Sequence, residues 1–198
     1  MPASAIISAI ALGIGLSACC GFRVFIPLLV ASIGAYFKWI PVNDGMGWLG
    51  TVPAMLSFGT AAIFEVSAYY IAFIDNLLDT IAAPLAILAG TLIAATVLPI
   101  GELDPMLKWG LGILAGGATA GTIQVGSGLL RLLSTKTTAG LGNSVIASGE
   151  NLAAITGSVG SLLLPVIMAI IMLGFAIFLG FRILGRIAGK RIPDQIDP

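Results

Sequence analysis

Three charged side chains inside apolar stretches are the sharpest chemical signals in this sequence. Arg23, Glu65 and Glu150 each stand within a long run of apolar residues. A charge in the hydrocarbon of a membrane costs about 2.5 to 3.5 kcal/mol on insertion scales, so such a residue needs a partner, water or a ligand. We predict that the three converge between two halves of the chain and form a binding or gating site. The alternative is that Arg23 snorkels or forms a static salt bridge that only fixes helix packing.

Arg23 would neutralise one glutamate and leave the other free to take a proton or a cation. Removing Arg23 alone should then do more damage than removing it with its partner, because the single change leaves a buried carboxylate unpaired. Pro27 follows Arg23 by four residues. Because proline lacks an amide donor and clashes with the carbonyl one turn earlier, we expect a kink near Arg23.

Two further polar sets supply candidate ligands. Asp75 and Asp79 are four residues apart, so both would face one side of a helix, an arrangement that suits a proton-coupled or hard-metal site. The alternative is a solvated loop, and the sequence leaves any metal unidentified. The second set lies on and after the fourth apolar segment. The candidate binding residues are Arg23, Glu65, Asp75, Asp79, Gln124, Arg131, Asn143, Glu150 and Asn151.

Composition indicates that a membrane surrounds these charges. The chain has 198 residues, of which 58% are hydrophobic and 9% charged, whereas a soluble domain has about a quarter charged residues. A water-soluble globule is therefore excluded. Without histidine, the chain has no Ser-His-Asp triad and no histidine-ligated zinc or haem. Cys19 and Cys20 are adjacent and are expected to be small packing residues. The net charge is zero, so the chain lacks the excess of basic residues that is typical of nucleic-acid-binding proteins.

The sequence predicts an all-α polytopic membrane protein with about six spans, or five plus a re-entrant segment. The charges mark expected spans at about 6–37, 51–70, 82–100, 107–133, 144–156 and 161–184. The first exceeds the ~20 residues of one crossing and should be tilted, broken or partly outside lipid. The fifth is short enough to be re-entrant, with 157–160 as the expected break before the sixth. Residues 140–143 are the best candidate for a broken helix that aims backbone groups into a cavity.

The chain is expected to be one transmembrane domain, 1–198, made of two inverted three-span halves. Residues 5–104 form the first half, 105–187 the second, and 188–198 a short cytoplasmic tail. Aligning Gly21 with Gly121 matches small residues, and further on Glu65 pairs with Glu150. Gly/Ala-rich helices also align by composition alone.

The chain is expected in the inner (plasma) membrane, and basic residues in short loops favour an orientation with both termini cytoplasmic. In the six-span arrangement Lys38 and Lys108 lie outside, together with the three tryptophans. The basic residues expected inside are Arg131, Lys136, Arg182, Arg186, Lys190 and Arg191.

Several of these residues together resemble a bacterial membrane family catalogued as a domain of unknown function, the DUF4126 type. The resemblance spans about residues 10 to 170. It rests on Gly21-Phe22-Arg23 with Pro27, Glu65-x-x-Ala68 with Asp75 and Asp79, Arg131 with 137–143, and Ser148-x-Glu150. The family pattern has an Asp-Lys pair where this chain has Tyr69-Tyr70, and an acidic residue where it has Asn151. These departures remove charges from the candidate site.

Transport or conduction of a small solute or ion is the expected function. Intramembrane charges in both halves, Pro/Gly breaks and the absence of a soluble catalytic domain favour it. One alternative is a structural or assembly protein with static interhelical salt bridges. Another is a metal-dependent membrane enzyme in which Asp75 and Asp79 hold a metal that acts on a lipid phosphate, although no enzyme activity and no cofactor are expected. The expected partners are the lipid bilayer, the solute or ion and, as an open alternative, further copies of the chain.

Overall fold

A computed structural model of the chain describes residues 2–100, 103–138 and 140–189, apart from the side chains of 72, 73, 75–77, 79 and 186–189. The described residues form helices and no strand, which confirms the predicted all-α class. The elements are α1 (Ala3–Cys19), α2 (Phe25–Tyr36), η1 (Gly47–Gly50), α3 (Val52–Ala68), α4 (Ala72–Val97), α5 (Pro105–Gly112), η2 (Ile113–Gly117), α6 (Ala118–Thr138), α7 (Asn143–Leu163) and α8 (Pro165–Gly189).

Three helical segments in the described part of the chain are long and apolar enough to cross a membrane. They are Thr80–Val97 in α4, the continuous run Pro105–Thr138, and Pro165–Gly185 in α8. The run Pro105–Thr138 comprises α5, η2 and α6, where η2 is a π-helical turn inside one long rod. The helices α1, α2 and α3 are apolar but shorter.

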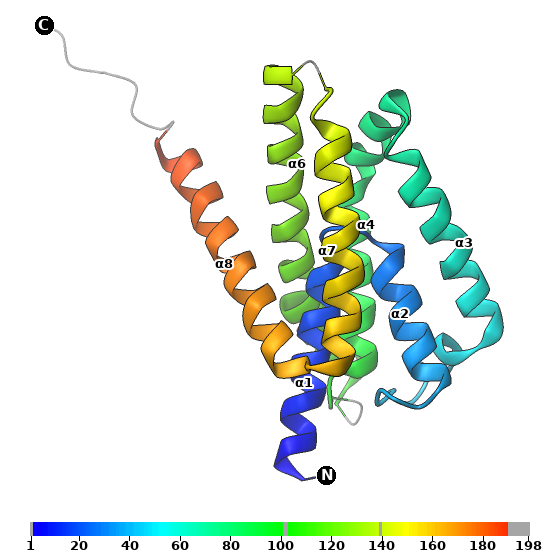
Figure 1. Cartoon of the computed structure of the whole chain (residues 1–198). Coiled ribbons are helices and arrows are strands. Elements are labelled where there is room, and N and C mark those ends of the chain that lie inside the picture. The colour runs from blue at the N-terminus through cyan, green and yellow to red at the C-terminus, as the bar shows by residue number, and fades with distance from the viewer. Residues whose placement is uncertain (1, 101–102, 139, 190–198) are drawn as a thin grey trace, which may run out of the picture.

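The expected first span, 6–37, is a hairpin of two helices. Gly15 of α1 and Gly34 of α2 both lie against the last turns of α7, whereas Arg23 between them contacts Glu150, about three turns earlier in α7. The chain thus rises along α7, reverses at 20–24, and descends to the same end of the bundle (Figure 1). The segment is therefore broken, which is one of the expected forms, and its two helices lead to and from the same end of the bundle.

The reversal occurs where the sequence predicts a kink. α1 ends in tight turns in which the amides of Phe22 and Arg23 both donate to the carbonyl of Cys19. Pro27 lies in the first turn of α2, where a missing amide donor costs no helical hydrogen bond. A helix continuing through Arg23 would instead bring the proline ring against the Arg23 carbonyl.

The structure corrects two expectations about the second half. α7 is a continuous helix of 21 residues that passes through 157–160, so the short fifth segment is wrong. Gly157 packs against Cys19 of α1, and the break falls at Leu164, because Pro165 cannot continue the helix. Residues 140–143 connect α6 to α7 at one end of the bundle and do not interrupt a helix within it. The re-entrant segment is therefore the first, and α3, α4, α5–α6, α7 and α8 run the length of the bundle (Figure 1).

The hairpin also changes where the ends of the chain lie. α1 begins at one end of the bundle and α8 ends at the other (Figure 1), unlike the expected arrangement with both termini on one side. The physical reason is that the hairpin returns the chain to the end of the bundle at which α1 begins. The two halves accordingly differ in their first element, and the inverted repeat stays a prediction.

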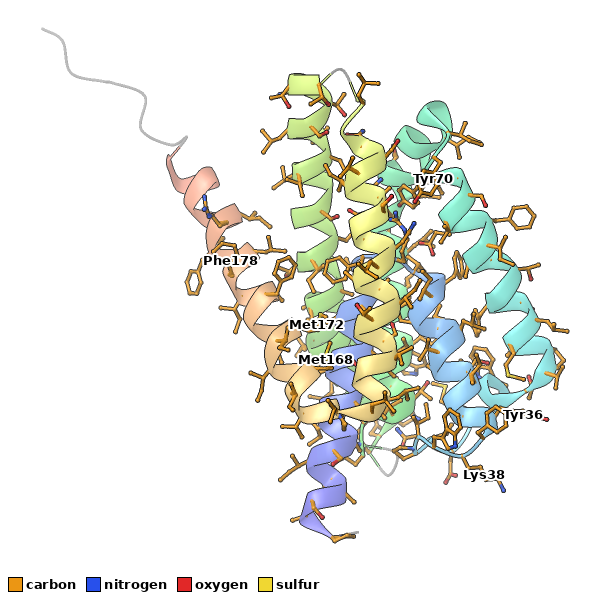
Figure 2. All side chains as sticks on the ribbon, in the orientation of Figure 1. Tyr36, Lys38, Tyr70, Met168, Met172 and Phe178 are labelled. Atoms are coloured by element: carbon orange, nitrogen blue, oxygen red, sulfur yellow. The ribbon has the colours of Figure 1, made fainter. Side chains whose placement is uncertain are left out.

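Small residues bring the helices close together. The hydroxyl of Ser17 donates to the carbonyl of Gly90 at 2.8 Å, which ties α1 to α4. Cys19 and Cys20 are free and fully buried, in agreement with their expected packing role. Met168 and Met172 of α8 pack against glycines of α7 (Figure 2), so the first half of α8 is anchored to the bundle.

Candidate functional site

Arg23 lies at the hairpin tip and is 1% exposed. Its Nη1 donates to the Glu150 carboxylate at 2.8 Å, and its Nε donates to the Oδ1 of Asn151 at 2.5 Å. The carbonyls of Phe22, at 3.0 Å from Nη1, and Ala147, at 3.2 Å from Nη2, accept two more hydrogen bonds. The guanidinium therefore links the break between α1 and α2 to the middle of α7.

Glu150 is the centre of this network. Arg131 of α6 forms a salt bridge to the same carboxylate, with its Nε 3.2 Å from Oε1 of Glu150, and the Ser127 hydroxyl donates to that oxygen. Ser127 and Arg131 are four residues apart on α6, so both face α7. Two buried guanidinium groups thus share one buried carboxylate, and these three groups carry a net positive charge.

Tyr69 contacts both arginines. The guanidinium carbon of Arg23 is 3.8 Å from the centroid of the Tyr69 ring, and that of Arg131 is 4.2 Å from it. Cation–π attraction of this kind contributes about 0.5 to 2 kcal/mol per pair, with the larger values in desolvated sites. One ring therefore stabilises both cations that share the Glu150 carboxylate.

Tyr70 closes the network on the α3 side. Its hydroxyl lies 3.0 Å from the Ser148 hydroxyl and accepts from the Nδ2 of Asn151 at 3.3 Å. Figure 2 shows Tyr70 at the end of α3 beside α7. We name the set Arg23, Tyr69, Tyr70, Ser127, Arg131, Ser148, Glu150 and Asn151 the hairpin-tip cluster.

Glu65 of α3 caps the second helix of the hairpin. Its two carboxylate oxygens accept from the backbone amides of Val24 at 2.8 Å and Phe25 at 3.0 Å. These amides are among the donors that a helix leaves unpaired at its start, where the helix dipole also favours a negative charge. Glu65 thus lies next to Arg23 in the folded structure, but its carboxylate accepts its hydrogen bonds from backbone amides.

Two cavities reach the site from different sides. One of about 500 Å³ lies between α6, α7 and α8, and its lining includes Ser127 and Glu150. The other, of about 270 Å³, lies between α3, α4 and the start of α2, and its lining includes Glu65 and Tyr69. Closely packed apolar side chains fill the opposite part of the bundle, towards the start of α1, among them Leu12, Leu16, Leu28, Leu49, Ile93 and Val97.

The structure brings together four of the predicted site residues directly. Arg23 bonds to Glu150 and to Asn151, and Arg131 bonds to Glu150. Glu65 lies next to them at the hairpin tip. Arg23, Glu65 and Glu150 therefore lie together at the hairpin tip, with the difference that Arg131 is a second cation on Glu150. Their convergence near the bilayer midplane stays a prediction. Their role in binding stays a prediction.

The other predicted residues lie outside the cluster. Gln124 is buried on α6, one turn before Ser127, and among the described residues it forms no hydrogen bond to the cluster. Asn143 begins α7 and donates to the hydroxyl of Thr135 at 3.0 Å, about two turns from Glu150. Asp75 and Asp79 are in the first turns of α4, but their side chains lie outside the described part of the structure. Over the described residues no group of three metal-binding side chains occurs.

The tyrosines are the cluster members that sequence reasoning did not propose as site residues. Tyr69 follows Glu65 by four residues, so both lie on one face of α3, and this spacing is the signal that indicates it. Ser127 and Ser148 are recognisable as polar residues near charges, but only the fold shows that they contact the cluster.

Comparison with known proteins identifies one family. The domain of unknown function DUF4126 matches residues 10–185, which includes every member of the hairpin-tip cluster. No curated protein and no solved structure gives a significant match. The chain therefore belongs to the DUF4126 family.

Proposed function

We propose that this chain is a membrane transporter or channel for a small solute or ion, with the hairpin-tip cluster as its binding site. The α1–α2 hairpin is the observation that carries the proposal, because its tip holds buried charges midway along the bundle. Irregular backbone at membrane depth is tolerated where it is buried in protein or lines a wet cavity, and in transporters such breaks form ligand sites. The proposal assigns no catalytic step and no cofactor to the chain.

The cavities and the core give the proposed pathway a direction. Both cavities approach the cluster from the half of the bundle towards the α6–α7 connection, whereas apolar packing closes the half that holds the start of α1. This asymmetry is expected of a site open to one side only. Opening of the other side would require the hairpin to move against α4 and α7.

The shared carboxylate supports a ligand-exchange mechanism. Glu150 bonds to two guanidinium groups, so displacement of its carboxylate would leave both of them without their shared partner. Arg23 and Arg131 would then bind a small anion in its place, since guanidinium groups suit planar oxyanions. Return of the Glu150 carboxylate to the two arginines would release that anion.

The location of basic residues suggests an orientation in the plasma membrane. Lys136 and Arg182 lie towards one end of the bundle, whereas the loop with Lys38 lies at the other, beside exposed tryptophans. The positive-inside rule then places the α6–α7 connection and the end of α8 in the cytoplasm, and the start of α1 outside.

Flux measurements in proteoliposomes test the proposed function. We expect the purified chain to conduct or exchange at least one member of a panel of inorganic cations, inorganic anions and small carboxylates. Glu150→Gln should abolish this flux, while Lys136→Gln, which removes an exposed cation of the neighbouring helix α6, should leave it within about twofold of the wild-type value. Absence of flux for the whole panel from folded protein would contradict transport.

A structural role is the second candidate, and a specific observation favours it. Four hydrogen bonds and the Tyr69 ring surround the Arg23 guanidinium, so the cluster is well satisfied without any ligand. Networks of this kind fix helix packing. In that case Glu150→Gln would destabilise the protein, and the wild-type protein would show no flux.

A further inference from the structure

The larger cavity extends beyond the hairpin-tip cluster, and most of its walls there are apolar. It lies between α6, α7 and α8, above the point where Leu179 of α8 packs against Gly126 of α6. From there α8 diverges from α6 towards its carboxyl end (Figure 1). Its apolar walls include half-exposed side chains, namely Leu130, Leu133, Phe175 and Phe178. Phe178 is on α8 next to Leu179 (Figure 2).

An apolar void of this size on the outside of a membrane bundle must be filled by its surroundings. Its volume is about 500 Å³, and a cavity with apolar walls does not hold ordered water. In a bilayer the neighbouring molecules at this depth are lipid acyl chains. Apolar contact along such a groove is favourable at about 25 cal/mol per Å² of surface removed from water, and shape complementarity adds packing contacts within lipid.

The charged side chains of the lining make the two ends of this groove different. Glu150 lies at its inner end, where two arginines already neutralise it, and Arg182 lies at its outer end. Arg182 is exposed, with its guanidinium carbon 5.6 Å from the Phe178 ring, and it follows Phe175 by about two turns of α8. The sequence continues with Arg186, Lys190 and Arg191, so this end of the chain is basic.

We propose that this groove is a binding site for one anionic phospholipid. An acyl chain lies along the apolar walls between α6, α7 and α8, and the headgroup phosphate contacts Arg182 at the rim. Basic residues at the end of a membrane helix attract anionic headgroups by about 1 kcal/mol each, which corresponds to about fivefold in affinity. The site does not depend on transport, and it holds equally for a structural protein. With an acyl chain in this cavity, the smaller cavity beside Glu65 and Tyr69 is the proposed route of a solute or ion to the cluster.

Native mass spectrometry of the purified full chain, titrated with phosphatidylglycerol or with phosphatidylcholine of identical acyl chains, tests the site. We expect one phosphatidylglycerol to be retained per chain, and phosphatidylcholine to bind about fivefold more weakly. Arg182→Gln should lower phosphatidylglycerol binding to the phosphatidylcholine level. Lys136→Gln, at an exposed cation outside the groove, should not change it.

Filling the groove tests the position of the acyl chain. Gly149 lines the cavity, and a side chain added there meets open space, so Gly149→Leu should cut binding of both lipids by at least about tenfold. Gly174→Leu is the matched control, because Gly174 is equally open but lies outside the lining. If Gly149→Leu does not fold, Leu133→Trp fills the groove from α6. Leu132→Trp is its control, because Leu132 lies outside the lining.

Other outcomes overturn the proposal. Phosphatidylglycerol binding that survives the groove-filling variants would place the lipid elsewhere, and equal binding of the two lipids would remove the role of Arg182. Competition by inorganic phosphate alone at equal concentration would indicate a free anion site. Loss of a dimer in Gly149→Leu, without loss of lipid, would mean that a second copy of the chain covers the groove.

Discussion

Arg23 and Glu150 meet across 127 positions of the sequence, with Nη1 of the arginine 2.8 Å from Oε2 of the glutamate. The contact joins the tip of the α1–α2 hairpin to the middle of α7. Because Arg131 binds the same carboxylate, the pair is part of a triad in which one anion serves two cations. This sharing determines which substitution should be most damaging.

We expect Glu150→Gln to be the most destabilising single change in the triad, because it leaves two buried guanidinium groups without their anion. The expected loss in the free energy of unfolding is about 3 to 5 kcal/mol. Arg23→Gln should cost less, since Glu150 keeps Arg131. Reversible unfolding in mixed micelles measures both.

This order replaces the expectation that loss of Arg23 alone leaves Glu150 unpaired, because Arg131 remains bound to that carboxylate. The double variant Glu150→Gln with Arg131→Gln should be more stable than Glu150→Gln alone, since it removes the excess cation. A larger loss for Arg23→Gln than for Glu150→Gln would contradict the sharing.

Glu65 should act as the cap of α2. Glu65→Ala removes the acceptor for the amides of Val24 and Phe25, and a lost cap costs about 0.5 to 2 kcal/mol. Glu65→Gln keeps one acceptor oxygen and should lose less. Hydrogen exchange of the peptide that covers the start of α2 measures the effect, which should be faster in Glu65→Ala and intermediate in Glu65→Gln. Equal exchange in all three proteins would show that the cap contributes nothing.

Tyr69 should contribute through the faces of its ring. Tyr69→Leu removes both cation–π contacts and should lower the free energy of unfolding by about 1 to 3 kcal/mol, whereas Tyr69→Phe keeps the ring in contact with both guanidinium groups. The same unfolding titration compares them. If both variants lose the same stability, the hydroxyl and not the ring face is the contributing group.

The hairpin tip needs a small residue where it touches α6. A Cβ at Gly21 would lie 2.5 Å from the carbonyl oxygen of Ala120, so Gly21→Ala should displace the tip and cost about 1 to 3 kcal/mol. Gly128→Ala is the control, because that position in α6 is open and alanine favours helix by about 1 kcal/mol. Equal stability of the two variants would show that the tip tolerates the shift.

The sequence predicts the helices and the charged residues of the site better than it predicts their topology. Arg23, Glu65 and Glu150 are evident because charge in an apolar run is costly wherever the run lies. The kink near Arg23 follows from Pro27, a local effect. The reversal of the chain at this point does not follow from a local effect. It depends on Glu65 of α3, which accepts a hydrogen bond from the Val24 amide, and on Glu150 of α7, which binds Arg23.

Other features depend on contacts that no local pattern encodes. The glycines of 157–160 were expected to break a helix, whereas Gly157 allows α7 to approach Cys19 of α1 closely. The same residue type serves a break or a close approach, and only the partner helix decides between them. Arg131 was a candidate ligand, and its place on the Glu150 carboxylate follows from the packing of α6 against α7.

Side-specific labelling of single cysteines tests the re-entrant hairpin most directly. In a protein with Cys19 and Cys20 replaced by alanine, Ser4→Cys, Lys38→Cys and Leu141→Cys are reacted in sealed proteoliposomes with a membrane-impermeant maleimide. The structure predicts that Ser4→Cys and Lys38→Cys, before and after the hairpin, react from the same side, and that Leu141→Cys, between α6 and α7, reacts only from the other. Labelling of Ser4→Cys and Lys38→Cys from opposite sides would show that 6–37 crosses the membrane, which would contradict the hairpin and the site built on its tip.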